Sequence, residues 1–180
     1  MKIWSFVILI VVIFIGGAIW FLYSGQYNIA ATQPHASPVR WFFTSVKDQS
    51  IDHHADRIQL PDLTDPGLVR SGAQHYASTC QVCHGAPGQE LSEIAKGMNP
   101  PPPELHDGKT QKRYTEKELY WIVANGIRMT GMPAFGPTHK KEDLAAIVAF
   151  VGRLPEIKPD EYKSMAGTGG HKPSEREHAG

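Results

Sequence analysis

Both cysteines of this 180-residue chain lie in one stretch of five residues, Cys80-Gln81-Val82-Cys83-His84. On one turn of helix, two thiols separated by two residues project to the same side. Each thiol can therefore add to a vinyl group of one porphyrin, and the histidine that follows is held beneath the ring, where its imidazole can bind iron. This spacing is the attachment signature of c-type haem. We therefore predict one covalently bound haem c, with Cys80 and Cys83 as thioether residues and His84 as an axial ligand.

Two other uses of a cysteine pair fit this sequence less well. A thioredoxin-like redox pair is expected beside a βαβ pattern, which the sequence does not show. A structural zinc site needs four ligands, usually from a second pair at a matching interval. The chain has nine histidines but no second cysteine pair, and we interpret His53 and His54 as solvated. Because one motif uses both cysteines, a disulfide framework is not expected.

The N-terminal segment is long and apolar enough to cross a membrane. Residues 3–23 contain no charged side chain, and as a helix they would span about 31 Å, which matches a bilayer core. Trp20, Phe21 and Tyr23 lie where interfacial aromatic residues are common. A cleaved signal peptide is the alternative, but the apolar stretch is long for one and no small-residue cleavage site follows it. We expect residues 1–24 to be a retained transmembrane anchor.

The charge before this segment predicts its orientation. Lys2 is the only charged residue ahead of the span, so the positive-inside rule places the N-terminus in the cytoplasm and the rest of the chain outside. Haem c is attached on that outer side. We therefore expect a single-pass protein of the cytoplasmic (inner) membrane, with its haem domain facing the periplasm or the outside.

Residues 25–64 form a connector between the anchor and the haem domain. Within it, four apolar residues recur with the i, i+3, i+4, i+7 spacing of one helical face. They are Val39, Phe42, Phe43 and Val46. This face can pack on the haem domain, or it can lie on the membrane or a partner protein with help from Arg40, Trp41 and Lys47. The pattern favours neither possibility.

The haem domain is expected to occupy residues 65–155 and to begin with a helix. Thr64-Asp65-Pro66 supplies a capping side chain followed by proline in the first turn. This helix should run to about Thr79 and lead into the haem motif. Gly72 and Tyr76 lie four residues apart on one face, which predicts either a close helix crossing or an ordinary core contact.

Two further helices follow in this domain. Thr115 and Glu118 have the spacing of a capping box, and Asn125-Gly126 is typical of a helix end. A last helix is predicted from Thr138 to about Leu154, because its apolar residues repeat at intervals of three and four.

A proline run lies between the motif and the second of these helices, at Asn99-Pro100-Pro101-Pro102-Pro103. Its four prolines lack backbone donors and hold a stiff extended conformation. We expect the run to line the His84 side of the haem, with one carbonyl accepting a hydrogen bond from the second nitrogen of His84. The sequence does not say which carbonyl does so.

Two methionines are candidates for the opposite side of the haem. The stretch 128–135 contains Met129 and Met132. A thioether sulfur is a soft, neutral iron ligand, and a loop can bring it over the face opposite His84. Met132 lies between Gly131, which permits close backbone approach, and Pro133, which stiffens the loop. By residue type alone, either methionine can serve.

The C-terminal segment and the overall charge complete the pattern. Residues 156–180 turn polar and rich in glycine, so we expect a disordered tail in which His171 and His178 are solvated. Lys plus Arg and Asp plus Glu each number 18. This balance gives no indication of a nucleic-acid partner.

Together these features resemble class I c-type cytochromes, in their membrane-anchored bacterial monohaem form. The resemblance covers about Asp65 to Pro155. It rests on Cys80–His84, on Gly72 with Tyr76, on Gly131–Phe135, and on Ile147–Val151 in the last helix. It implies a small all-α fold around one haem in which the first and last helices cross near Gly72. It also implies that Met132, rather than Met129, is the sixth iron ligand. The stretches 99–103 and 126–135 are similar to a subgroup found beside bacterial respiratory enzymes.

The function expected from this resemblance is one-electron transfer in a respiratory-type chain, not catalysis. His84 and Met132 would both stay bound as the iron changes oxidation state. The expected partners are membrane lipid and membrane-bound or periplasmic redox proteins, such as a dehydrogenase, a terminal oxidase or a quinol-oxidising complex. One alternative is a haem subunit of a larger membrane oxidoreductase complex. A less favoured one is a catalytic or gas-sensing haem domain with a displaceable sixth ligand.

Overall fold

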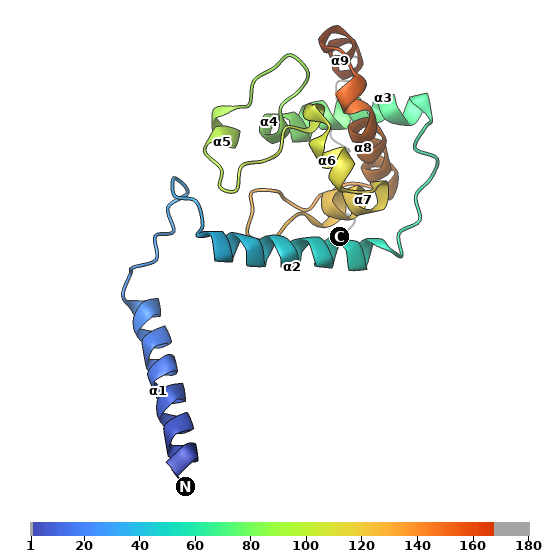
Figure 1. The fold of residues 1–180 in the computed structure, drawn as a ribbon. Coiled ribbons are helices and arrows are strands. Elements are labelled where there is room, and N and C mark those ends of the chain that lie inside the picture. The colour runs from blue at the N-terminus through green and yellow to red at the C-terminus, as the bar shows by residue number, and fades with distance from the viewer. Residues whose placement is uncertain (1, 168–180) are drawn as a thin grey trace, which may run out of the picture. The chain divides into compact units, whose positions relative to one another are not determined.

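The computed structural model describes residues 2–167, and among these residues it is helical and has no β-strand. The chain divides into two compact units, residues 1–34 and 35–180. The first unit contains α1 (Lys2–Tyr23) (Figure 1). Within the described part of the chain, α1 is the one helix long and apolar enough to cross a membrane. Its length and composition fit a membrane anchor or a signal sequence.

The second unit is a helical domain with its longest helix, α2 (Ser37–Ala55), along one side of it (Figure 1). Its elements are α2 (Ser37–Ala55), α3 (Pro66–His75), η1 (Tyr76–Cys80), α4 (Gln81–His84), α5 (Glu93–Lys96), η2 (Leu105–Asp107), α6 (Lys109–Arg113), α7 (Glu116–Asn125), α8 (Lys141–Arg153), η3 (Leu154–Glu156) and α9 (Pro159–Ala166). The all-α fold expected from the sequence is confirmed for the described residues.

The centre of the domain is the contact between α3 and α8. A Cβ atom added at Gly72 would lie 1.9 Å from the carbonyl oxygen of Ala146, so only glycine permits this approach of the two backbones. One turn later, Tyr76 is fully buried and its ring centroid lies 5.2 Å from that of Phe150. The prediction of a close crossing at Gly72 is confirmed.

The helix boundaries follow the capping signals in two cases and depart from the prediction in one. Asp65 caps α3 by accepting a hydrogen bond from the Gly67 N–H group, and the capping box of Thr115 and Glu118 begins α7. The last long helix begins at Lys141, three residues later than predicted. The reason is local: the side chain of Asp143 accepts a hydrogen bond from the Lys140 N–H group and so closes the first turn there.

The expectation of a disordered tail from residue 156 is wrong for α9. Tyr162 on this helix is 1% exposed, and its ring lies against Tyr76 and Phe150. One buried aromatic residue among charged neighbours produces no long apolar stripe, so the sequence pattern did not reveal the helix. The remaining tail, with His171 and His178, lies outside the described residues.

The helix in the connector, α2, packs on α7 through its C-terminal half. Ile51 and Ala55 are buried there, and the ring of His54 lies 5.6 Å from that of Trp121. Three residues of the apolar face predicted over residues 39–46, Phe42, Phe43 and Val46, are instead exposed. Packing on the haem domain is therefore confirmed for α2, but through a different face from the predicted one.

Candidate haem-binding site

The haem motif lies at the end of one nearly continuous helical segment. α3 passes into a π-helical turn, η1, and then into α4, which ends at His84. Gly85 follows with φ of +70°, a conformation that glycine adopts without strain and that lets the chain turn away directly after the histidine. The structure thus brings Cys80, Cys83 and His84 together on one short stretch of helix. π-Helical turns of this kind are frequent at functional sites.

The two cysteines differ in their surroundings. Cys80 is buried and Cys83 is partly exposed, and neither forms a disulfide. Burial raises the pKa of the Cys80 thiol, since a thiolate is disfavoured away from water. Neither thiol is in a disulfide, and the two cysteines lie three positions apart, within one helical turn. Thioether attachment to one porphyrin requires this arrangement.

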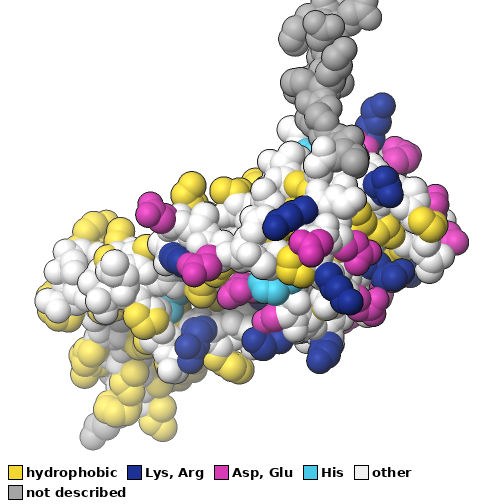
Figure 2. Space-filling model, turned by 90° about the horizontal axis from the view of Figure 1, so that it is seen from above, with side chains coloured by type: hydrophobic (Ala, Val, Ile, Leu, Met, Phe, Trp, Pro, Cys, Tyr) yellow, Lys and Arg dark blue, Asp and Glu magenta, His cyan; other side chains and the backbone are white. Residues whose placement is uncertain are grey.

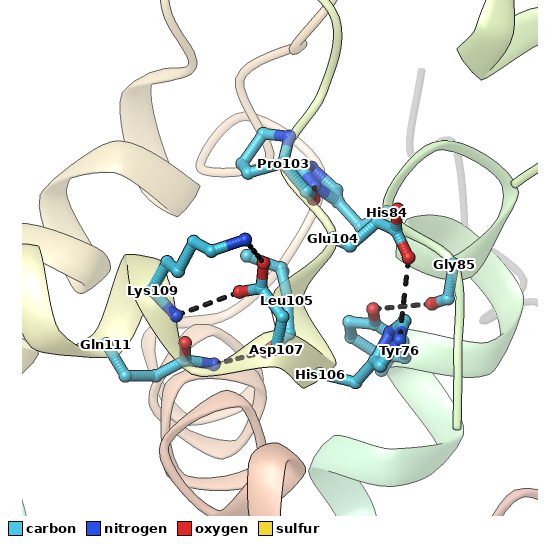
Figure 3. Close-up of polar contacts among 10 residues, drawn as sticks. All are labelled: Tyr76, His84, Gly85, Pro103, Glu104, Leu105, His106, Asp107, Lys109 and Gln111. Carbon is cyan, nitrogen blue, oxygen red and sulfur yellow. Dashed lines mark hydrogen bonds and ion pairs between the residues drawn. The ribbon is translucent and has the colours of Figure 1, made fainter. Parts of the chain in front are cut away.

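The proline run supplies the hydrogen-bond partner that was expected for His84. The Nδ1 atom of His84 lies 2.8 Å from the carbonyl oxygen of Pro103 (Figure 3). Because a carbonyl oxygen only accepts, this geometry places the proton on Nδ1 and leaves the lone pair of Nε2 free for iron. Burial lowers the pKa of His84, which also favours the neutral imidazole. The carbonyl that the sequence could not identify is that of Pro103.

The segment after Pro103 is tied to α8. The Nε2 atom of Gln111 donates hydrogen bonds to the carbonyl oxygens of Leu105 and Val151, at 2.7 and 2.8 Å. Figure 3 shows the first of these bonds beside the Pro103–His84 contact. Leu105 itself is buried in the core. The carbonyl that orients His84 is therefore held, through η2, against the main helix of the domain.

Two buried tyrosines hold the ends of α4. The hydroxyl of Tyr76 donates to the carbonyl oxygen of Gly85 at 2.7 Å (Figure 3). The hydroxyl of Tyr162, on α9, donates to the Oε1 atom of Gln81 inside the haem motif. Burial raises the pKa of Tyr76 far above its usual value and that of Tyr162 to about 12, so both hydroxyls keep their protons. The role of Tyr162 was missed because it lies about 80 residues from the motif.

Met132 lies on a separate element, the loop after α7. This loop is hydrogen-bonded back to the end of that helix. The N–H group of Phe135 donates to the carbonyl of Val123 at 3.1 Å, and that of Gly136 donates to the carbonyl of Ala124 at 2.9 Å. The loop therefore leaves α7 at Gly126 and returns to it ten residues later.

The backbone on both sides of Met132 is held within this loop. Its N–H group donates to the Oγ1 atom of Thr130, and its carbonyl accepts from the N–H group of Ile127 at 3.3 Å. Gly126 has φ of +65°, and a Cβ atom there would lie 2.7 Å from the Met132 carbonyl oxygen. Met132 is partly buried, whereas Met129 is 75% exposed and has a positive φ.

Met98 joins the two sides of the site, a contact that the sequence reasoning missed. A Cβ atom added at Gly131 would lie 2.9 Å from the Met98 sulfur. Met98 comes directly before the proline run, and Gly131 comes directly before Met132. The loop that orients His84 and the loop that carries Met132 therefore touch at this point. The signal in the sequence was Gly131, whose missing side chain permits the approach.

Comparison with known families decides the identity of this domain. Residues 67–151 match the family described as Cytochrome C oxidase, cbb3-type, subunit III. These residues form a c-type cytochrome domain. The match begins in α3 and ends in α8, so it contains the haem motif and Met132 and leaves out α1, α2 and α9. A search of the curated proteins found no match to the chain.

The residues of the cytochrome domain fit the haem c that its family implies. Two free thiols stand at the required spacing, and His84 presents Nε2 because its Nδ1 atom is bound to Pro103. The domain is thus a haem-binding, electron-transfer unit. The N-terminal apolar helix, α1, fits a membrane protein.

Proposed function

We propose that this protein is a one-electron carrier of a respiratory-type chain, held at the outer face of the cytoplasmic membrane by α1. It carries one haem c, attached through Cys80 and Cys83 and ligated by His84 and Met132. The observation that carries this proposal is the hydrogen bond between the Nδ1 atom of His84 and the Pro103 carbonyl, which leaves Nε2 free to bind iron next to the two thiols in the chain. The backbone hydrogen bonds of the Met132 loop support the second ligand.

Haem c supplies a one-electron couple to the domain that binds it. The protein's part is to keep the surroundings of that group unchanged between the two oxidation states. Pro103 and the buried tyrosines hold His84 and α4 in one orientation, and the end of α7 holds the Met132 loop. Ligands that stay bound keep the reorganisation small, and neutral sulfur ligation favours the ferrous state. With protein side chains at both axial positions, no open position is left for a substrate, so we propose a carrier and not an enzyme.

A second candidate is a fixed subunit of a larger oxidoreductase complex. The description of the matched family, an oxidase subunit, favours this form. The chemistry would be the same, but the partner would be permanent. The partners proposed in either case are membrane-bound or periplasmic redox proteins, such as a dehydrogenase, a terminal oxidase or a quinol-oxidising complex. On the face of the molecule in Figure 2, basic and acidic side chains interleave, so this face offers a partner no field of a single sign.

The absorption spectrum of the full-length holoprotein in detergent tests the ligand set. A low-spin, six-coordinate ferric haem with the weak sulfur-to-iron charge-transfer band is expected. A five-coordinate, high-spin spectrum with ready binding of carbon monoxide would overturn the carrier in favour of catalysis or gas sensing.

Two preparations test the anchoring and the choice between carrier and subunit. The full-length chain should stay in the membrane fraction after high-salt and carbonate washing, whereas release by salt would contradict the anchor. Purification in mild detergent should yield the chain without stoichiometric partners. Stable co-purification with an oxidase or dehydrogenase would replace the free carrier with the fixed subunit.

A further inference from the structure

The N-terminal half of α2 exposes a group of large apolar side chains. Phe42 is 54% exposed, Phe43 44% and Val46 52%. We call these three residues the aromatic face. Trp41, which is 70% exposed, lies on another side of the helix, about 150° around the axis from them. The other half of the same helix is buried in the contact with α7, where Ile51 and Ala55 are 1% and 2% exposed. A single helix therefore has one apolar side that is covered by the domain and another that is not.

The two apolar sides of α2 point in nearly opposite directions. At 3.6 residues per turn, the centre of the stripe formed by Val39, Phe42, Phe43 and Val46 lies about 150° around the helix axis from Ile51 and Ala55. The cytochrome domain thus packs on one side of α2, and most of the aromatic face is directed away from it. This arrangement suits a helix that lies between the domain and a second apolar surface.

The charged residues of the N-terminal part of the chain, residues 1–47, favour a lipid bilayer as this second apolar surface. Residues 1–47 contain no aspartate or glutamate, and their basic residues are Lys2, Arg40 and Lys47. All 18 acidic residues lie after residue 47. Lys47 and Asp48 both face the domain: Lys47 pairs with Asp48 at 2.8 Å, and Asp48 also pairs with Arg113 and accepts a hydrogen bond from Tyr114. The part of α2 before them has no acidic residue and one basic residue, Arg40. An acid-free amphipathic segment with aromatic side chains is typical of helices that lie in the headgroup region of bilayers.

The covalent chain keeps the aromatic face close to a membrane. α1 ends at Tyr23 and α2 begins at Ser37. Fully extended, the residues between them span at most about 45 Å. A bilayer crossed by α1 is therefore an apolar surface permanently within reach of α2.

We propose that the aromatic face of α2 lies in the lipid interface of the bilayer that α1 crosses. α2 then mounts the cytochrome domain on the membrane, with the domain on the side of the helix that faces the aqueous phase. The inference rests on the proposed anchoring by α1. Its consequence is that the haem domain does not move freely on a tether but is held at the membrane in a restricted orientation.

Nitroxide labelling of the full-length holoprotein, one chain per nanodisc of phosphatidylcholine and phosphatidylglycerol, tests this surface. In the holoprotein Cys80 and Cys83 are thioethers and do not take the label. A label at Phe42→Cys should collide more often with oxygen, which partitions into lipid, than with a water-soluble nickel chelate. The matched control is Ser164→Cys on α9, at the opposite end of the domain from α2 (Figure 1). Its label should show the reverse preference.

The outcomes distinguish an error in the proposed lipid contact of α2 from an error in the proposed anchoring by α1. If the label at residue 42 is as accessible to nickel as that at residue 164 while the chain stays in the disc, the lipid surface is overturned, and a protein partner or a second copy becomes the occupant. If the chain does not stay in the disc, the anchoring is overturned and this proposal with it. In a second variant, Phe43→Gln with Val46→Gln should lower the oxygen preference of the label at residue 42 and leave the haem spectrum unchanged.

Discussion

The two sides of the haem site are built in different ways. On one side, the proposed ligand His84 ends a helical segment whose neighbours are the buried core, the proline run and α9. On the other side, Met132 lies on a loop that is hydrogen-bonded to itself and to the end of α7. Met98 against Gly131 is a contact between the two sides.

Because of this difference, we expect substitutions on the His84 side and in the Met132 loop to affect different properties of the protein. The contacts that hold His84 also hold α3, α8 and α9 together, so substitutions on that side should change haem retention or the free energy of unfolding. The loop of Met132 contributes few buried side chains to the core. Substitutions of Met132, the proposed sixth ligand, should change the spectrum and the reduction potential more than the fold. Four experiments test this distinction, from the largest expected effect to the smallest.

Removing both thiols should abolish the holoprotein. The double variant Cys80→Ala/Cys83→Ala cannot form a thioether, and a domain of about 90 residues cannot bury enough surface to tolerate an empty centre. Each single variant should keep at most one thioether. Haem staining after denaturing gel electrophoresis measures the attachment. A double variant that kept its haem through the gel would show that attachment lies elsewhere.

Substitution at the helix crossing should destabilise the whole domain. Gly72→Ala places a methyl group against the Ala146 carbonyl, and we expect the free energy of unfolding to fall by about 3 kcal/mol. The matched control is Gly152→Ala on α8, where an added Cβ atom meets nothing within 4 Å. That change should raise stability by roughly 0.5–1 kcal/mol. Urea unfolding of the holoproteins measures both, and similar effects at the two positions would contradict the crossing.

Substitution of the proposed sixth ligand should act on the iron and little on the fold. Met132→Ala should lose the sulfur-to-iron band and lower the reduction potential by on the order of 0.1 V, a modest part of the ~0.8 V range that axial ligands span. Met129→Ala, at the exposed tip of the same loop, should keep both. Spectroscopy and redox titration make the comparison. The opposite pattern would transfer the ligand role to Met129.

The smallest effect is expected at α9. Tyr162→Phe removes the hydroxyl that bonds Gln81 and should cost about 1 kcal/mol of unfolding free energy, with no change in the haem spectrum. The control Tyr120→Phe alters a hydroxyl for which the described residues show no hydrogen bond, so it should cost less. Equal stabilities of Tyr162→Phe and the native holoprotein would mean that α9 does not support the motif.

The sequence by itself determined those features whose physical cause lies within a few neighbouring residues. The two thiols of the haem motif stand three positions apart, and the imidazole follows directly after the second. The capping side chains of α7, Thr115 and Glu118, also stand three positions apart. At Gly72 the sequence left a close helix crossing or an ordinary core contact open, and the resemblance to class I c-type cytochromes favoured the crossing. The haem motif and the capping box each act within one helical turn, whereas the partner of Gly72, Ala146, lies 74 positions away in the chain.

Only the tertiary structure decided which distant groups complete these local features. The carbonyl that orients His84, the methionine that packs on Gly131 and the tyrosine that bonds Gln81 lie between 19 and 81 residues from their partners. The face by which α2 packs was likewise hidden. Its most regular apolar stripe is not the one that is buried, since Ile51 and Ala55 are covered while Phe42, Phe43 and Val46 are exposed. A periodic pattern reports that a helix has an apolar side, but the surface that covers it is built by another part of the chain.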